Sequence, residues 1–194
     1  HRGVTVVAPT DSHFYPDLDV LASMLGPKTK VVIINSPNNP SGAVYPVSLV
    51  ADIGKLLRKA STKHGRDIFL VSDEPYRNIL YDGLTYPHVF SHYNASIAVT
   101  SHAKDLALPG ERIGYIATNP SYEAKMELVD GFTFCNRILG FVNAPAIMQR
   151  AVRALQGVTI DVAQYQKKRD YLYSRLTSIG YSVEKPMGAF YMFP

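Results

Sequence analysis

The sequence has only one cysteine, Cys135, and it contains no apolar run long enough to cross a membrane. A single cysteine excludes a disulfide within the chain, which is typical of a reducing compartment, so we expect a cytoplasmic protein. The N-terminus lacks the pattern of a signal peptide, and we expect no membrane partner. Cys135 lies among apolar, helix-forming residues, so we predict that it packs rather than reacts.

Strong charge of one sign is also missing, since the net charge is +4 and charged residues make up 19% of the chain. The basic residues are scattered among acidic ones. The densest basic run, Lys167-Lys168-Arg169, lies on a predicted helix beside Asp170, and we interpret it as a solvated helix face. We therefore predict no nucleic-acid partner. With 46% hydrophobic residues, the composition is that of an ordinary globular protein.

Both ends of the sequence fall inside predicted regular structure. The chain lacks an initiator methionine and enters the β-type run 4–8 almost at once. At the other end, residues 189–194 read as a strand that stops midway. We therefore expect this chain to be a piece of a longer protein.

Short apolar runs alternate with amphipathic helical patterns through the first half of the chain. This order is typical of an α/β fold with a largely parallel sheet, whose buried strands are apolar on both faces. Predicted strands cover residues 4–7, 31–34, 68–71, 97–100 and 113–117, and predicted helices cover 17–25 and 46–65.

The second half is predicted to be mostly helical. Two or three short helices are expected between residues 122 and 155, with Gly131, Gly140 and Pro145 marking breaks. A further helix is expected over 161–179. Short strands are then predicted over 181–184 and 189–193.

Polar loops follow three of the predicted strands. They carry Asn39, Asp73 and Lys104 respectively. Right-handed crossovers bring the carboxyl ends of parallel strands to one edge of a sheet, where α/β proteins place their chemistry. We therefore expect these three loops to converge.

The segment between the last two predicted strands carries a hydroxyl, an amine and a guanidinium, from Ser101, Lys104 and Arg112. Such a set is suited to holding a phosphate beside a reactive lysine. The turn at Pro109-Gly110 would bring Arg112 back toward Lys104. The alternative interpretation is that these are solvated surface charges.

Asp73 ends an apolar strand, where a carboxylate needs a partner, although it could also be a turn former. If the ligand were pyridoxal phosphate, Asp73 would keep the ring nitrogen protonated and make the ring an electron sink. Tyr76 and Asn39 could hydrogen-bond to the ring oxygen. Lys104 would bind the cofactor covalently and then carry the proton of the substrate α-carbon.

Three motifs together resemble the class I/II aminotransferases, which are pyridoxal-phosphate enzymes of the aspartate-aminotransferase fold type I. The resemblance runs from Pro9 to Pro194 and keeps the order and internal spacing of the motifs. They are Ser36-Pro37-Asn38-Asn39-Pro40-Ser41-Gly42, Asp73-Glu74-Pro75-Tyr76, and Ser101-His102-Ala103-Lys104 with Pro109-Gly110-Glu111-Arg112-Ile113-Gly114-Tyr115.

By that resemblance Lys104 is the Schiff-base lysine, Asp73 the partner of the ring nitrogen, and Tyr76 and Asn39 the partners of the ring oxygen. Ser101 and Arg112 are phosphate ligands. The resemblance implies a three-layer α/β large domain with a mostly parallel sheet in residues 1–156, lacking its N-terminal part. Residues 157–194 would be a linking helix and the truncated start of a smaller α+β domain. It also implies a homodimer that acts on an amino acid and a 2-oxo acid in amino acid metabolism.

The chain departs from the family pattern at Ala103, where the family often has another hydroxyl residue. Other family features fall outside the chain: a second phosphate-binding turn, an aromatic residue that stacks on the cofactor, and the arginine that binds the substrate carboxylate. Residues 185–194 resemble the strand that precedes that arginine.

Two alternatives remain open: a lyase, decarboxylase or synthase of the same fold, and a non-catalytic regulator domain that senses pyridoxal phosphate. We predict no metal site at His88 and His92, because Pro87 and the loop-like surroundings disfavour one. His102 is expected to be structural. The sequence has no glycine-rich nucleotide fingerprint.

Overall fold

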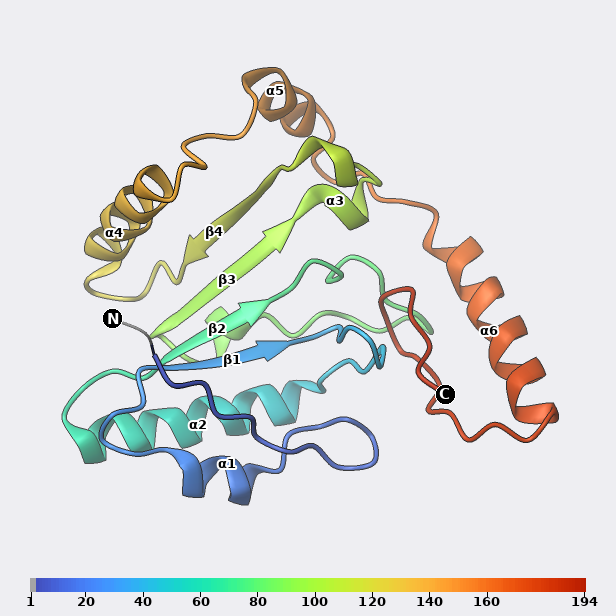
Figure 1. The fold of residues 1–194 in the computed structure, drawn as a ribbon, viewed down its shortest axis with the longest axis horizontal. Helices are drawn as coiled ribbons and strands as arrows, with labels where there is room; N and C mark the ends of the chain where they lie inside the picture. The colour runs from blue at the N-terminus through green and yellow to red at the C-terminus, as the bar shows by residue number, and fades with distance from the viewer. Residues whose placement is uncertain (1–2) are drawn as a thin grey trace.

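A computed structural model describes residues 3–194 and contains a four-stranded sheet in the order β1-β2-β3-β4 (Figure 1). The first three strands are parallel, and β4 is antiparallel to β3. The strands are β1 (Val31–Asn35), β2 (Phe69–Asp73), β3 (Ser96–Ser101) and β4 (Gly114–Thr118). The predicted α/β class and the mostly parallel sheet are confirmed.

Helices α1 (Leu18–Met24) and α2 (Val47–His64) follow the sequence predictions closely. The Asp17 carboxylate accepts hydrogen bonds from two backbone N–H groups in the first turn of α1. Pro46 precedes α2, and Gly65 ends it in the left-handed conformation (φ +64°) that glycine adopts without strain.

The main core lies between α2 and one face of the sheet. Ile53 and Leu57 of α2 are fully buried there, as is Leu70 of β2. Each such side chain contributes about 1.5–3 kcal/mol by its removal from water. This packing fixes the strands whose carboxyl ends carry the polar loops.

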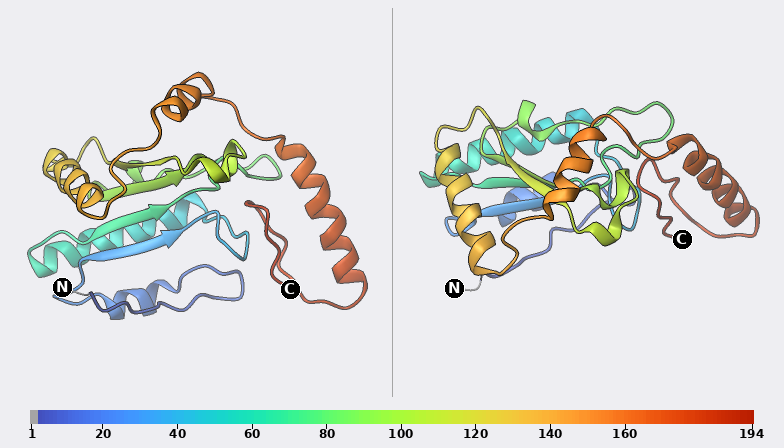
Figure 2. Two further views of the ribbon diagram at one scale, coloured as in Figure 1. Left: turned by 45° about the horizontal axis from the view of Figure 1, so that its top comes forward. Right: turned by 90° about the horizontal axis from the view of Figure 1, so that it is seen from above.

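Three helices lie in the second half: α4 (Lys125–Ile138), α5 (Ala146–Ala154) and α6 (Val162–Ser178). Figure 2 shows α4 and α5 on the side of the sheet opposite α2, so the architecture has three layers. The predicted breaks at Gly140 and Pro145 are confirmed. Gly131 lies inside α4, so a break there was wrong; a lone glycine weakens a helix by about 1 kcal/mol without ending it.

Short helical turns complete the path of the chain. One is η1 (Val89–Ser91), and two others, α3 (His102–Asp105) and η2 (Pro109–Glu111), lie between β3 and β4. None of the helices in residues 3–194 combines the length and the apolar character needed to span a bilayer.

Three predicted strands are absent. Residues 4–7, 181–184 and 189–193 are extended or bent, and only the isolated bridge between Leu80 and Gly188 touches the last region. Val4 is 92% exposed. Their composition favours β-structure, but a strand also needs a neighbour that pairs with it over several residues. In the described chain, the pairing near these regions is limited to the bonds of residues 187–189 with Gly42 and with residues 79–81.

One face of the sheet is partly open. Ile33 of β1 and Ile116 of β4 point away from α2 and are 70% and 52% exposed. The expectation that β1 is covered on both faces was therefore wrong, because its side chains alternate between the core and this open face.

Arg169 of α6 is buried, although the sequence analysis placed it on a solvated helix face. Its guanidinium donates to both carboxylate oxygens of Asp82 at 2.9 and 3.0 Å, and to the Pro186 carbonyl at 2.6 Å. It also pairs with Asp170 at 2.8 Å. The prediction is confirmed for Lys167 and Lys168, which are exposed, and was wrong for Arg169, because Asp82 and Pro186 are not its neighbours in the sequence.

Cys135 also differs from expectation, since it is exposed on α4 rather than packed. The apolar residues around it in the sequence do not cover it, because Phe134 and Ile138 of the same helix are both 64% exposed.

Candidate active site

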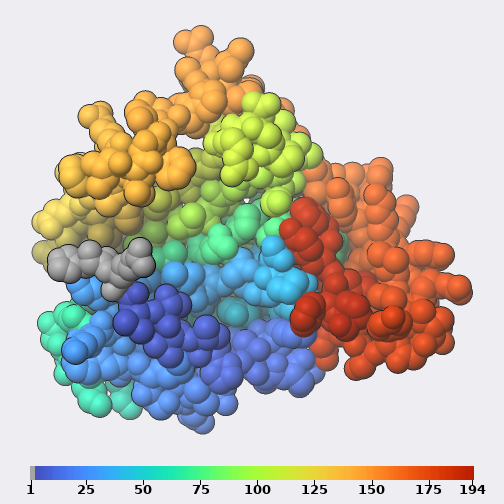
Figure 3. All heavy atoms as spheres, viewed as in Figure 1, coloured from blue at the N-terminus to red at the C-terminus, as the bar shows by residue number. Residues whose placement is uncertain are grey.

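The carboxyl ends of β1, β2 and β3 lie on the same side of the molecule as the C-terminal segment (Figure 1). Figure 3 shows this segment, residues 185–194, packed against the loop that follows β1. Its backbone is fixed there because the Met187 and Gly188 N–H groups both donate to the Gly42 carbonyl, at 2.9 and 3.0 Å.

Asn35, the last residue of β1, joins two of the polar loops. Its amide nitrogen donates to the Asp73 carboxylate at 3.1 Å and to the Asp73 carbonyl at 3.0 Å. Its side-chain oxygen accepts from the Asn39 backbone N–H at 2.8 Å. The position of Asn39 relative to Asp73 is thus set by one side chain.

Asp73 is half-buried at the end of β2. Burial raises the pKa of its carboxyl above the ordinary value, because removal from water disfavours the charged form. A half-buried carboxylate is stabilised when a protonated group lies beside it.

Tyr76 follows in the turn after β2, and its hydroxyl lies 2.7 Å from that of Tyr191. The Asn39 side chain lies near the Tyr76 hydroxyl and acts to lower its pKa. The Tyr76 ring packs edge-on against the rings of Phe190 and Tyr191, with centroids 5.4 and 5.5 Å apart. Burial, and secondly the hydrogen bond with Tyr191, raise the pKa of Tyr76.

Lys104 lies in α3, directly after β3. Its amine is 5.8 Å from the centre of the Tyr76 ring and 5.7 Å from that of Phe190. Within residues 3–194 no carboxylate forms an ion pair with this amine. The structure thus brings Asn39, Asp73, Tyr76 and Lys104 to one edge of the sheet, and the predicted convergence of the three loops is confirmed.

Ser101 and Arg112 lie at the two ends of the α3–η2 connection. The Ser101 hydroxyl accepts from the Ala103 N–H at 3.1 Å and caps α3. Arg112 is exposed, has φ +50°, and donates to the Pro109 carbonyl at 3.0 Å. In the described chain no hydrogen bond joins Arg112 to Ser101 or Lys104, so its approach to Lys104 stays a prediction.

A buried polar group holds α3 in place. The Asp105 carboxylate accepts from the Asn78 amide at 3.0 Å and lies 3.6 Å from the His102 ring nitrogen. The His102 ring also packs on Tyr115, with centroids 5.8 Å apart. These contacts fit the interpretation of His102 as a structural residue.

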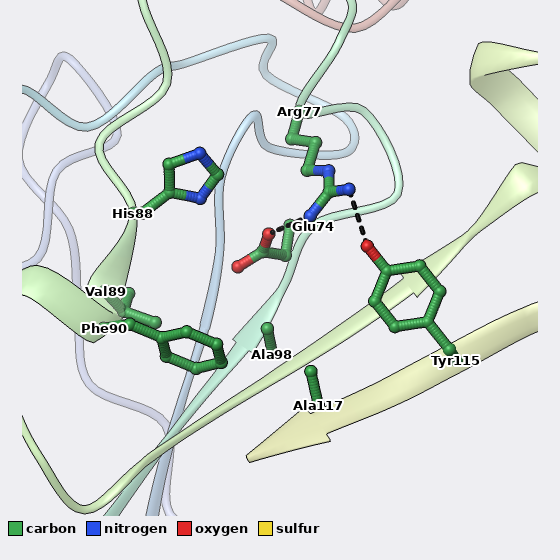
Figure 4. Close-up of a pocket in the computed structure, with 8 residues that line it drawn as sticks. All are labelled: Glu74, Arg77, His88, Val89, Phe90, Ala98, Tyr115 and Ala117. Carbon is green, nitrogen blue, oxygen red and sulfur yellow. Dashed lines mark hydrogen bonds and ion pairs between the residues drawn. The ribbon is translucent and has the colours of Figure 1, made fainter. Parts of the chain in front are cut away.

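A separate cavity of about 240 Å³ has Ala98 of β3 and Ala117 of β4 in its lining (Figure 4). Arg77 projects into it between two partners, the buried Glu74 carboxylate at 3.4 Å and the Tyr115 hydroxyl at 2.6 Å. His88 lines this cavity as well. Nowhere in residues 3–194 do three His, Cys, Asp or Glu side chains lie close enough together to hold a metal ion.

The sequence analysis missed three residues of this site: Asn35, Phe190 and Tyr191. Asn35 had a signal, since a polar residue closing an apolar strand needs a hydrogen-bond partner. For Phe190 and Tyr191 the sequence gives no such signal, because residues 189–193 are predicted as a strand. Their contact with Tyr76 depends on how the chain bends at Ala189.

Comparisons with known proteins agree on one family. The sequence model of the family "Aminotransferase class I and II" matches residues 1–194. The chain is 33% identical to the aspartate/prephenate aminotransferase of Thermus thermophilus, over 98% of this chain and 49% of that protein. It is 30% identical to aromatic-amino-acid aminotransferase 2 of Thermococcus litoralis, over 99% of this chain and 49% of that protein.

Among solved structures, an amino transferase from Eubacterium rectale is 45% identical and superposes with a TM-score of 0.92. That match covers 95% of this chain and 47% of the other. The chain therefore spans about half the length of the curated relatives and solved structures it matches.

Proposed function

Since this chain belongs to the class I and II aminotransferase family, we propose that the full-length protein containing it is a pyridoxal-phosphate-dependent aminotransferase. It moves an amino group between an amino acid and a 2-oxo acid. The observation that carries this proposal is the Lys104 amine, which has no ion pair in the described chain and lies against Tyr76 at the sheet edge that also holds Asp73.

The donors and acceptors at this edge fit pyridoxal phosphate. An aldehyde needs an amine, which Lys104 supplies. A pyridine nitrogen needs a partner that stabilises its protonated form, and Asp73 is a half-buried carboxylate with only Asn35 as a described hydrogen-bond partner. A phenolic ring oxygen needs donors, and the Tyr76 hydroxyl and the Asn39 amide are adjacent to each other.

When bound, the cofactor supplies an aldehyde that takes up the amino group and a ring that withdraws electrons from the substrate α-carbon. The Lys104 amine holds the cofactor and then carries the proton to and from that carbon. The Asp73 carboxylate holds the proton at the ring nitrogen. Tyr76 and Asn39 orient the ring through its oxygen.

Ser101 and Arg112 are proposed to bind the phosphate. The Arg112 guanidinium presents a planar set of donors suited to two phosphate oxygens. Phosphate would compete with the Pro109 carbonyl, which now accepts from Arg112 at 3.0 Å. Until phosphate binds, the hydrogen bond to the Pro109 carbonyl holds the Arg112 guanidinium against its own loop.

We further propose that residues 1–156 belong to the cofactor domain and residues 157–194 to the linking helix and the start of the smaller domain. The two parts meet in a cluster of Tyr76, Ile79, Tyr81 and Ala189, against which Val162 and Tyr165 of α6 pack. The amino acid and 2-oxo acid substrates are supported by the names of the relatives. The homodimer and the cytoplasmic location stay predictions.

Trapping of the cofactor tests the central residue. The full-length protein incubated with pyridoxal phosphate and reduced with borohydride should carry the label on Lys104, located by peptide mass spectrometry. Lys104→Ala should lose the label, and Lys125→Ala should keep it, because Lys125 donates to the Pro120 carbonyl at the start of α4. A label on any other lysine would overturn the assignment.

Product analysis separates amino transfer from the alternatives. The full-length protein with a panel of amino acids and 2-oxoglutarate should form glutamate and the matching 2-oxo acid. Carbon dioxide or an amine as product would identify a decarboxylase, and a trapped adduct without turnover would favour the regulator.

A further inference from the structure

Phe190 and Tyr191 both contact Tyr76, although they are consecutive in the sequence. Successive side chains of an extended chain point in opposite directions, so such a pair reaches one ring only if the backbone bends. The bend is at Ala189, which has φ +58° and is fully buried. We call Phe190 and Tyr191 the aromatic clamp on Tyr76.

The clamp is fixed by hydrogen bonds to the turn that carries Tyr76. The Ala189 N–H donates to the Ile79 carbonyl at 3.0 Å, and the Tyr81 N–H donates to the Met187 carbonyl at 2.9 Å. The Tyr81 hydroxyl also donates to the Ala189 carbonyl. The position of Tyr191 relative to Tyr76 is therefore set by the backbone on both sides.

A tyrosine hydroxyl has one proton to donate and two lone pairs that accept. The Asn39 side chain lies near this hydroxyl in Tyr76. The bond between the hydroxyls of Tyr76 and Tyr191, at 2.7 Å, is compatible with either one as donor. If Tyr76 donated to Tyr191, it would have no proton left for a ligand. If Tyr191 donates, the Tyr76 proton is free.

We propose that Tyr191 is a positioning residue for the reaction, whose hydroxyl donates to Tyr76 and so directs the Tyr76 proton toward the ring oxygen of the cofactor. A phenol that accepts a hydrogen bond becomes a stronger donor, because the bonds polarise one another. The C-terminal segment thus acts on the cofactor through Tyr76 without touching it. This inference rests on the proposed function.

The groups that face Tyr76 define what else can affect its proton. They are the Tyr191 hydroxyl, the Asn39 amide, the Asp73 carboxylate and the Lys104 amine. Tyr191→Phe removes the Tyr191 hydroxyl and keeps the ring contacts of Phe190 and residue 191 with Tyr76. Of the four groups that face Tyr76, it therefore alters only the Tyr191 hydroxyl.

The visible absorbance of bound pyridoxal phosphate, titrated against pH in the full-length protein, reports on this hydrogen bond. When the hydrogen bond from Tyr76 weakens, the ring oxygen of the cofactor becomes more basic and holds a neighbouring proton more tightly. The pH midpoint of the absorbance change therefore rises. Tyr191→Phe should raise the midpoint by about 0.5–1 pH unit, the size of one ordinary hydrogen bond. Tyr76→Phe should raise it by at least as much.

The double variant distinguishes positioning from an independent effect. Tyr76→Phe/Tyr191→Phe should show the same midpoint as Tyr76→Phe alone, because Tyr191 acts only through Tyr76. Tyr122→Phe is the matched control, since its hydroxyl donates to Asp67 at 2.8 Å instead, and should titrate like the wild type.

A wild-type midpoint in Tyr191→Phe, or additive shifts in the double variant, would overturn the role of Tyr191. In both cases the wild-type protein would still bind the cofactor on Lys104. If the wild type shows neither a visible band nor a borohydride adduct, the proposed function itself fails, and the role of Tyr191 fails with it.

Discussion

Single residues at the sheet edge combine a proposed role in the reaction with a cost in stability, and Asp73 is the clearest case. Burial raises its pKa above the ordinary value of 3.8, so the charged form is disfavoured in the folded state relative to the unfolded one. Folding is therefore penalised at pH values above the raised pKa, and the penalty disappears as the pH falls below 3.8.

Asp73→Asn should consequently stabilise the protein without cofactor at neutral pH. Asparagine keeps an oxygen that accepts from Asn35 and removes the buried charge. We expect a higher melting temperature than in the wild type, with the difference shrinking as the pH is lowered toward 3.8. Asp130→Asn, at an exposed position of α4, is the control and should show no such pH-dependent gain. A lower melting temperature for Asp73→Asn at neutral pH would contradict this account.

Asp73→Ala should instead cost activity. Loss of one charge placed to stabilise a transition state typically lowers turnover by about 10²–10³-fold. Cofactor binding should partly survive, because Lys104, Tyr76 and Asn39 remain. The measurement is kcat in the full-length protein at saturating cofactor, with the borohydride adduct as a check on binding. Near-normal turnover would mean that Asp73 is only a turn former.

The sequence was sufficient to find Asn39, Asp73, Tyr76 and Lys104, because each lies just after a predicted strand and parallel strands end at a common edge. Their assignment to cofactor groups stays a prediction. Tyr191 was beyond the reach of sequence reasoning, since it meets Tyr76 across 115 residues. That contact depends on a positive φ at Ala189, a residue that gives no local sign of one.

Among the helices and strands, those with local signals were predicted well. α1 has its capping aspartate, α2 has Pro46 and Gly65 at its ends, and α6 has Asp161 before its first residue. The C-terminal segment was predicted as a strand and is not one. Its backbone hydrogen bonds go to loops around residues 42 and 79–81, and nothing in its own composition specifies those partners.

The attachment of this segment predicts a specific sensitivity at Gly188. A Cβ there would lie 2.8 Å from the Ile79 carbonyl oxygen and 2.9 Å from side-chain carbons of Pro37 and Val44. Gly188→Ala should therefore lower stability by about 1–3 kcal/mol, seen as a lower melting temperature.

Gly131→Ala is the matched control, because a Cβ at this position of α4 meets nothing within 4 Å. It should raise stability by about 0.5–1 kcal/mol, since alanine favours a helix over glycine. Equal melting temperatures for the two variants would show that the C-terminal segment is not held by the contact at Gly188.

At the scale of the whole molecule, the chain carries the proposed cofactor residues but only about half the length of its relatives. Positioning of the substrate supplies up to about 7–11 kcal/mol of an enzyme's effect on the barrier. By the family resemblance, the carboxylate-binding arginine and the stacking aromatic residue lie outside these 194 residues.

The isolated chain should therefore fail to transaminate while the full-length protein succeeds. The assay compares both with the same amino donors and 2-oxoglutarate at saturating cofactor. Weak cofactor binding by the isolated chain is expected, because Lys104 and its neighbours are present. Turnover equal to that of the full-length protein would show that residues 1–194 suffice and that the missing features are dispensable.

The distance along the chain between Tyr76 and the aromatic clamp also sets the order in which the site is built. A ribosome delivers the N-terminal part first, and every residue of β1, α2, β2 and β3 precedes residue 102. The residues of the sheet edge, Asn39, Asp73 and Tyr76 among them, are thus made before the C-terminal segment. The entropic cost of closing the loop between them grows only slowly with its length. Within residues 3–194 the clamp is therefore made after the strands, and a nascent chain that stalls before Ala189 has the residues of the sheet but leaves Tyr76 without its partner.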